Sequence, residues 1–350
     1  MTAANERPAR FVLEDVPRIG FYNGDDVCPR DTPVAGALTA VLQHLGDELG
    51  YERLEAHGRA WLLDLTYTFA MGVSGAAFFL SWGEGWAGDN VAVFYMSADA
   101  EAPERKVLEA FGYGHEWVMK AEGEARQRER IIAEISERQR PVLGYGVIGP
   151  PEPSVIAGYD EDGAVLIGWS YFQDVPPFNT GVESEPEGYF RKRDWFAGTE
   201  ALLVLGDKHE PPPLAETHRK ALQWALQVAR VPMTHPELDA PKWYRGRRNG
   251  LAAYEAWAGA LQRDDDFVAD DPAVLWHRYE VHNNAVGSVA EGRWYAAQFL
   301  RQMALREEGM AAELVAAAEC YEAEHDLMWQ AWGAVGGNGR SEAHVRKLQD

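Results

Sequence analysis

Cysteine is scarce in this sequence, because Cys28 and Cys320 are the only two among its 350 residues. Two cysteines so far apart cannot form the disulfide framework of a small secreted domain, so we expect a reduced, cytoplasmic protein. The sequence starts without a basic segment followed by an apolar run, which argues against a secretion signal. Its longest apolar stretches are short and broken by glycine, so we expect no membrane span.

Basic residues are also few. The chain has 33 Lys and Arg against 55 Asp and Glu, which gives a formal net charge of -22 at pH 7. This excess of acid argues against a nucleic-acid partner, because phosphate binding needs clustered cations. The one locally basic stretch, 244–250, is better explained as a helix flank or an interdomain contact. Hydrophobic residues make up 46% of the chain, which is enough for a substantial core.

Metal-ligand motifs are missing as well. The sequence has no HExxH and no paired Cys-x-x-Cys, and His277 and His282 are five residues apart, on different faces of a helix. Glu322 and His325 have a suitable spacing, but no third ligand lies near them in the sequence. We therefore predict neither a metal site nor a cofactor.

The chain changes character near residue 210. Before it, short apolar runs alternate with glycine and proline, and the stretch PEPSVIAGYDEDGAVLIGWS (151–170) predicts a β-hairpin with an acidic turn. Helix-like stretches occur at about 33–48, 103–112 and 121–138. After Pro211–Pro213, apolar residues recur every three or four positions. These patterns predict an α+β domain over 1–210 and an all-helical domain over 211–350.

Two segments of the first half could shape a binding cleft. In DTPVAGALTAVLQHLG (31–46), Asp31 or Thr32 can cap a helix whose first residue is Pro33, and an apolar stripe follows. In MGVSGAAFFLSWGEGW (71–86), Ser74 lies among small residues. This second stretch is either a buried turn or a wall of the cleft.

The order of these segments resembles the papain-like domain of double-glycine leader peptidases. It is most similar to the group that contains the N-terminal domain of the butirosin-biosynthesis acyltransferase, which adds a helical C-terminal region. The resemblance covers most of the chain and implies a papain-like cysteine-peptidase-type domain followed by helices. In that family a nucleophilic cysteine opens the first long helix, a histidine opens the first strand of the hairpin, and an Asp or Asn after the next strand orients the histidine.

None of the three roles keeps its residue here. The nucleophile position falls at Thr32 or Pro33, the histidine position at or beside Ser154, and the orienting position near Trp169 or Ser170. The resemblance therefore implies a catalytically silent protein that binds a small molecule or peptide in the inherited cleft. The ligand-binding candidates are Thr32, Ser74, Ser154 and Trp169.

Two alternatives stay open. In the first, Cys28 works with a histidine from elsewhere in the chain, His115 being the first choice, in a thiol-dependent amidase, peptidase or acyltransferase. Asp31 nearby would raise the pKa of a thiol, and Cys28 is more easily read as a core or loop residue. Cys320 has the surroundings of a helix-packing residue. In the second alternative, the protein is a scaffold whose helical domain forms a homodimer interface.

Overall fold

The computed structural model describes residues 7–21, 27–56, 59–231, 233–234, 246–267, 271–337 and 347. The chain divides into two compact units, each made of two stretches of sequence. The first unit comprises Met1–Tyr67 and Val107–Pro212, and the second comprises Thr68–Lys106 and Pro213–Asp350. The division after Pro212 lies close to the expected boundary at residue 210. Residues 68–106, which the sequence analysis assigns to the first domain, belong to the second unit instead.

The first unit is built around an eight-stranded antiparallel sheet. The strands follow the order β5-β11-β6-β7-β8-β10-β9, and β1 pairs with β7. They are β1 (Phe11–Val12), β5 (Tyr113–Met119), β6 (Val142–Tyr145), β7 (Pro153–Asp160), β8 (Val165–Trp169), β9 (Val182–Ser184), β10 (Phe190–Arg193) and β11 (Ala201–Lys208). The hairpin expected over 151–170 is confirmed as β7 and β8, which are joined by the 3-10 turn Glu161–Gly163.

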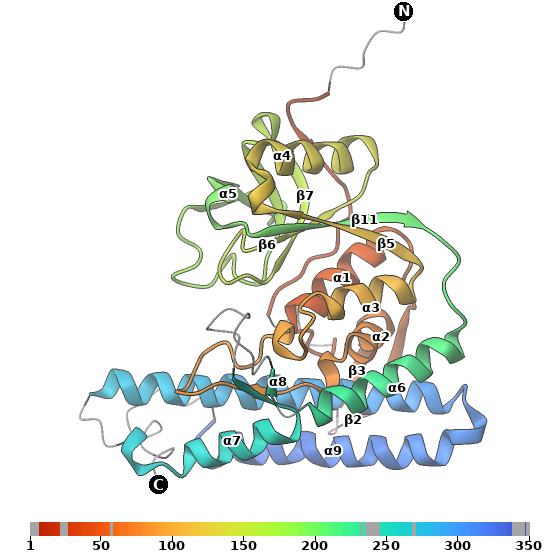
Figure 1. Cartoon of the computed structure of the whole chain (residues 1–350). Helices are drawn as coiled ribbons and strands as arrows, with labels where there is room; N and C mark the ends of the chain where they lie inside the picture. Colours follow the sequence, from red (N-terminus) through yellow and green to blue (C-terminus); the bar gives the residue numbers. More distant parts are fainter. Residues whose placement is uncertain are drawn as a thin grey trace, which may run out of the picture. The chain divides into compact units, whose positions relative to one another are not determined.

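Helices cover both faces of this sheet. Figure 1 shows α1 (Pro33–His44) on one face and α4 (Glu124–Ile132) on the other. Because both faces are covered, β8 is buried along its whole length and β7 along nearly all of it. The helix expected from residue 33 is confirmed: Thr32 is extended at the cap position and Pro33 is the first helical residue. It ends at His44, four residues before the expected end.

The remaining elements of the first unit lie outside the sheet. β2 (Tyr51–Ala56) and β3 (Arg59–Asp64) form a separate hairpin, and the four-residue α5 (Trp195–Gly198) precedes β11. The helix expected over 121–138 appears as α4 and a π-helical turn, Ala133–Glu137. α3 (Ala102–Ala110) matches the helix expected at 103–112 and crosses the boundary between the units.

A bulge in β7 allows β1 to lie beside it. The register between β7 and β8 shifts between Ile156 and Gly158, and Gly158 pairs with Val12 of β1. A Cβ atom on Gly158 would lie 2.7 Å from the backbone oxygen of Phe11. Only glycine fits this close approach of two backbones.

Long helices dominate the second unit, as expected. They are α6 (Leu214–Arg230), α7 (Leu251–Leu261), α8 (Pro272–Ala304) and α9 (Ala311–Ala334), together with most of α2 (Leu65–Ser74). α8 and α9 lie side by side (Figure 1) and are joined by a short connection containing the 3-10 turn Glu308–Met310. No described helix is both long and apolar enough to cross a lipid bilayer.

The second unit is not wholly helical, so that part of the prediction is wrong. The strands β4 (Ser81–Trp82), β12 (Met233–Thr234) and β13 (Arg247–Asn249) form a small antiparallel sheet. Strands of two or three residues are too short to show an alternating pattern, so no local pattern predicts them. The basic stretch 244–250 carries β13 and ends at Gly250, immediately before α7, which agrees with a helix flank.

Buried side chains explain why residues 68–106 belong with the helices. The guanidinium group of Arg293 in α8 is 3% exposed and donates a 2.7 Å hydrogen bond to the backbone oxygen of Ala77. The Trp224 indole in α6 donates to the backbone oxygen of Ser74 at 2.8 Å. These contacts join segments more than 140 residues apart, which local sequence patterns cannot reveal.

His282 of α8 is buried in the aromatic core of this unit. Its side chain is 4% exposed, and its ring lies against that of Trp257, with 5.4 Å between centroids. Neither ring nitrogen has a hydrogen-bond partner. Burial disfavours the charged imidazolium and lowers the pKa of His282 to about 4.

This burial predicts a loss of stability in mild acid. The unfolded chain binds a proton at His282 near pH 6.5, whereas the folded chain does so near pH 4, so stability falls as pH drops between these values. Relative to a His282→Phe variant, we expect the wild type to lose about 2 kcal/mol of unfolding free energy between about pH 7.5 and pH 5. Denaturant unfolding followed by tryptophan fluorescence measures the difference. If the wild type and His282→Phe differ in unfolding free energy by the same amount at both pH values, the prediction of a buried neutral imidazole is wrong.

Candidate functional site

The carboxylate of Asp64, at the end of β3, connects α1 and the segment before it to the start of α2. Asp64 is fully buried, and its Oδ1 accepts hydrogen bonds from the backbone amides of Thr66 (2.9 Å) and Tyr67 (3.1 Å). These bonds cap the first turn of α2. Its Oδ2 accepts from Arg30 Nη1 at 2.8 Å and from Gln43 Nε2 at 3.0 Å. One buried carboxylate therefore fixes α1, the start of α2 and the segment before α1.

Arg30 is held in its charged form. Burial disfavours the guanidinium cation, but the neighbouring Asp64 carboxylate outweighs this effect, and the pKa of Arg30 is raised above its ordinary value. The Arg30 side chain is 16% exposed. Its Nε is buried and has no hydrogen-bond partner. The N–H group at Nε of Arg30 is thus still able to donate a hydrogen bond.

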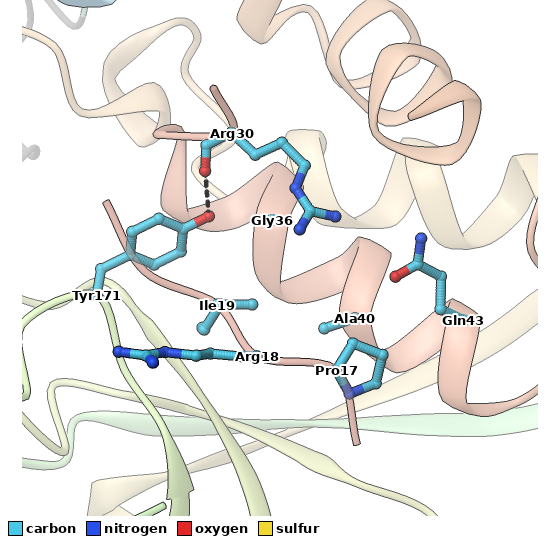
Figure 2. A pocket seen from close by; sticks show the side chains of 8 residues that line it. All are labelled: Pro17, Arg18, Ile19, Arg30, Gly36, Ala40, Gln43 and Tyr171. Carbon is cyan, nitrogen blue, oxygen red and sulfur yellow. Dashed lines mark hydrogen bonds between the residues drawn. The ribbon is translucent and has the colours of Figure 1, made fainter. Parts of the chain in front are cut away.

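A small pocket lies along α1 at this point (Figure 2). It is lined by Pro17, Arg18, Ile19, Arg30, Gly36, Ala40, Gln43 and Tyr171. Its empty volume of about 200 Å³ includes open solvent, and its enclosed part has room for a group about the size of a water molecule. The pocket therefore suits a single polar group of a larger ligand.

Tyr171 closes one side of the pocket against α1. Its hydroxyl donates a 2.6 Å hydrogen bond to the backbone oxygen of Arg30, as Figure 2 shows. A Cβ atom on Gly36 would lie 1.9 Å from this hydroxyl oxygen. Glycine at position 36 is therefore what lets the tyrosine lie on the helix.

Thr32 is the predicted ligand-binding residue nearest to this pocket along the chain. Its backbone amide donates to the Tyr67 hydroxyl at 3.0 Å, and its side chain does not cap α1. Trp169 is 5% exposed, and its indole N–H donates to the backbone oxygen of Val16 at 3.0 Å. The guanidinium of Arg18, which lines the pocket, lies 5.5 Å from the Trp169 ring centroid. Trp169 therefore supports the wall of the pocket from behind Arg18.

The strand register places Ser154 away from α1. Ser154 pairs with Gly144, Gly144 with Leu202, and Leu202 with Val118. Directly opposed residues share one face of a sheet. Glu116, two residues before Val118, is on this face too. Its carboxylate pairs with Arg126 and Arg130 of α4 at 3.4 and 3.1 Å.

Ser154 therefore lies on the face that α4 covers, which differs from the prediction that it lines the cleft. Its hydroxyl is buried and has no partner. Its neighbour Val155 lies on the opposite face with Trp169, with which it pairs. The face toward α1 thus carries Val155 and Trp169 where the resemblance would put a histidine and its orienting residue, and neither side chain can act as an acid or a base.

Ser74 belongs to the second unit, not to the unit that holds the pocket. It is fully buried, and its hydroxyl donates to the backbone oxygen of Met71 and accepts from the amide of Ala76, both at 3.2 Å. The next residue, Gly75, has φ +91°, so the chain turns sharply here. The buried-turn interpretation of this stretch is supported, and the cleft-wall interpretation is not.

The structure shows no hydrogen bond between Cys28 and His115, the two residues of the thiol-dependent enzyme alternative. Cys28 is 2% exposed, and its backbone amide donates to the oxygen of Leu62 at 3.0 Å. His115 lies in β5, where it pairs with Leu205. Its imidazole makes no hydrogen bond to the described part of the chain. Cys320 is exposed on α9, so the prediction that it packs inside a helix interface is wrong.

Sequence reasoning missed the residues that make the pocket. Asp64 had a readable signal, since Asp followed by Leu-Thr-Tyr at the end of an apolar run is typical of a helix cap. Arg30 and Tyr171 gave none, because their meeting depends on a contact across 141 positions. Among the described residues, no group of three or more His, Cys, Asp or Glu side chains is arranged to hold a metal ion.

Comparisons with protein-family models, with curated proteins and with solved structures found no match to this chain.

Thiol reactivity tests the burial of Cys28. In the native protein we expect Cys320 to be alkylated at the rate of an open thiol and Cys28 to react on the order of a hundredfold more slowly, because it must first become exposed. Mass spectrometry after timed iodoacetamide treatment measures both. Rapid alkylation of Cys28 with an apparent pKa well below about 8.5, lost in His115→Ala, would instead favour the thiol-dependent enzyme.

Substitution at Gly36 tests the packing of Tyr171. We expect Gly36→Ala to lower the unfolding free energy by about 1–3 kcal/mol, because the new methyl group collides with the tyrosine hydroxyl. Adding Tyr171→Phe should recover part of this loss, which a double-mutant cycle measures. Gly259→Ala is the control, since this helical glycine has open space around it and should be neutral or stabilising. Equal effects at positions 36 and 259 would contradict the collision.

Proposed function

We propose that this protein is a catalytically silent member of the papain-like superfamily. It binds a peptide or a small amide-containing molecule at the pocket beside α1. A carbonyl oxygen of the ligand accepts a hydrogen bond from Nε of Arg30. The protein works as a binding module and performs no thiol chemistry.

The arrangement of α1 and the sheet supports the papain-like part of this proposal. A helix that starts at Pro33 packs against β7 of an antiparallel sheet. This is the order of elements in which the family places a nucleophile and a histidine. The side chains found at those positions cannot supply them. Thr32 precedes a proline, Val155 and Trp169 occupy the sheet face toward α1, and Cys28 is buried.

The state of Arg30 is the observation that carries the binding part. Its Nη1 is fixed by Asp64 at 2.8 Å, while its buried Nε lacks an acceptor. A buried N–H without a partner costs about 1–3 kcal/mol, and a ligand oxygen would remove that cost. Since Asp64 already neutralises the guanidinium, the neutral but polar oxygen of an amide is the suitable partner.

The size and lining of the pocket agree with a carbonyl group. Only a group of about the size of a water molecule can enter the enclosed part, and a carbonyl oxygen meets this limit. Pro17, Ile19 and Ala40 supply apolar contacts around it. Specificity would then come from the part of the ligand that stays outside the pocket.

Replacing Arg30 by lysine tests the proposal. Arg30→Lys keeps the positive charge for Asp64 but removes the Nε–H. The probes are blocked dipeptide amides of the form N-acetyl-Xaa-Gly-amide, and binding is followed by saturation-transfer NMR. We expect the affinity of any bound probe to fall about tenfold, the value for one hydrogen bond to a charged donor.

Arg53→Lys is the matched control, because Arg53 is an exposed arginine of the same unit. It should bind as the wild type does. If no dipeptide amide binds the wild-type protein, or if Arg30→Lys and Arg53→Lys bind equally well, the proposed site is wrong.

A further inference from the structure

Six side chains of the second unit form a circuit, a chain of contacts that begins and ends on α8. They are Trp82, Trp86, Trp257, Phe267, Arg278 and His282. All belong to the unit of Thr68–Lys106 and Pro213–Asp350, so this cluster is separate from the pocket of the first unit and does not depend on the function proposed for it.

Aromatic rings form most of the circuit. Trp82 of β4 stacks on Trp257 of α7, with centroids 5.5 Å apart and an interplanar angle of 15°. Trp86 forms T-shaped contacts with Trp82 and with Phe267, with ring centroids 5.7 and 5.5 Å apart. Such pairs contribute stability beyond that of their buried area.

Two residues of α8 complete the circuit. The guanidinium carbon of Arg278 lies 6.0 Å from the Phe267 ring centroid, and the His282 ring lies 5.4 Å from that of Trp257. Arg278 and His282 are four residues apart, so they are neighbours on one face of the helix. The circuit therefore returns to its starting point along α8.

Three members of the circuit have buried polar atoms without a hydrogen-bond partner. They are the Trp257 Nε1, the Arg278 Nε and Nη1, and both ring nitrogens of His282. Trp257 is 5% exposed and His282 is 4% exposed, so bulk water does not hydrogen-bond to their buried nitrogens. Buried polar groups are nearly always satisfied in native proteins, and a group of unsatisfied ones on adjacent side chains needs an explanation.

The unpaired atoms are mainly donors, and one of them carries a charge. Trp257 and Arg278 can only donate, while a neutral His282 has one donor and one acceptor. Asn283 adds one buried acceptor, its Oδ1, at the next position of α8. Arg278 makes no ion pair with any residue that the structure describes. This is unusual in a chain with a net charge of -22.

One acidic group close to Arg278 is already engaged. Burial raises the pKa of the Asp266 carboxyl, but hydrogen bonds from Trp86 and Arg263 and the nearby guanidinium groups of Arg263 and Arg278 lower it below its ordinary value. Its Oδ2 accepts from the Trp86 indole at 3.0 Å and from Arg263 at 2.9 Å. Within the described part of the chain, the buried donors on Trp257 and Arg278 thus have no acceptor of their own.

We propose that this circuit is a binding site for a small oxyanion, a carboxylate or phosphate group, held by Arg278 and the indole N–H of Trp257. An oxyanion supplies several acceptor oxygens and could form an ion pair with Arg278, which makes none with the described residues, whereas a water molecule supplies two acceptors and no charge. The aromatic rings exclude bulk water and strengthen the contacts. Arg278 is half-buried and provides the route of entry.

Titration of the full chain with simple anions tests this site. Sodium phosphate and sodium acetate are added separately, with sodium chloride at equal ionic strength as the reference, and binding is followed by tryptophan fluorescence and calorimetry. We expect saturable binding of one equivalent of phosphate or acetate, and the preferred salt identifies the head group. Arg278→Gln should weaken this binding by about tenfold or more.

Arg306→Gln is the matched control, because it removes the same charge from an exposed position just beyond the other end of α8. It should leave binding unchanged. Trp257→Phe keeps a ring in place and removes only the indole donor, so it should also weaken binding, and it decides the matter if circular dichroism shows that Arg278→Gln is unfolded. The site is refuted if neither anion binds more than chloride, if the variants at 278 and 257 bind as the wild type, or if Arg306→Gln weakens binding equally.

Discussion

The buried carboxylate of Asp64 is the constraint on which the candidate site of the first unit depends. A carboxylate without water is stable only when its oxygens are fully hydrogen-bonded, and Asp64 reaches this state with donors from α2, from α1 and from Arg30. Because Arg30 is fixed in this way, its backbone oxygen is in place to accept from Tyr171. The tyrosine can then lie on α1 only because residue 36 is glycine. Each step positions the next one, so the pocket follows from a single buried charge.

Local sequence patterns predicted the elements that depend on local interactions. The start of α1, the β7–β8 hairpin and the long helices after Pro213 all follow from caps, turn residues and periodicity. The placement of residues 68–106 did not follow, because it depends on side chains such as Arg293 and Trp224 that reach across more than 140 positions. The three-stranded sheet was missed for a related reason. Its strands are too short for alternation to appear, and their partners lie far away in the sequence.

The candidate site shows a second limit of sequence reasoning. A family pattern places a residue at a position along a strand, but the face on which its side chain lies changes with every single residue. Ser154 and Val155 illustrate this, since one lies on the face covered by α4 and the other on the face of α1. A sequence pattern alone does not determine which of the two faces a given side chain occupies. The pairing of β5, β11, β6 and β7 determines it: Ser154 lies on the face that α4 covers, and its neighbour Val155 on the other face is neither an acid nor a base.

The two units differ in how they treat buried polar groups. In the first, the Asp64 carboxylate and the Arg30 guanidinium neutralise each other, and one N–H of Arg30 is left over. In the second, Arg293 donates to two backbone oxygens and forms an ion pair with Glu324, yet Arg278 on the same helix forms no ion pair with the described residues. If stability alone had shaped α8, an apolar side chain at position 278 or 282 would serve better than an unpaired one. The retention of arginine, histidine and an indole N–H in one aromatic circuit is therefore best explained by a group that binds there and supplies the missing acceptors.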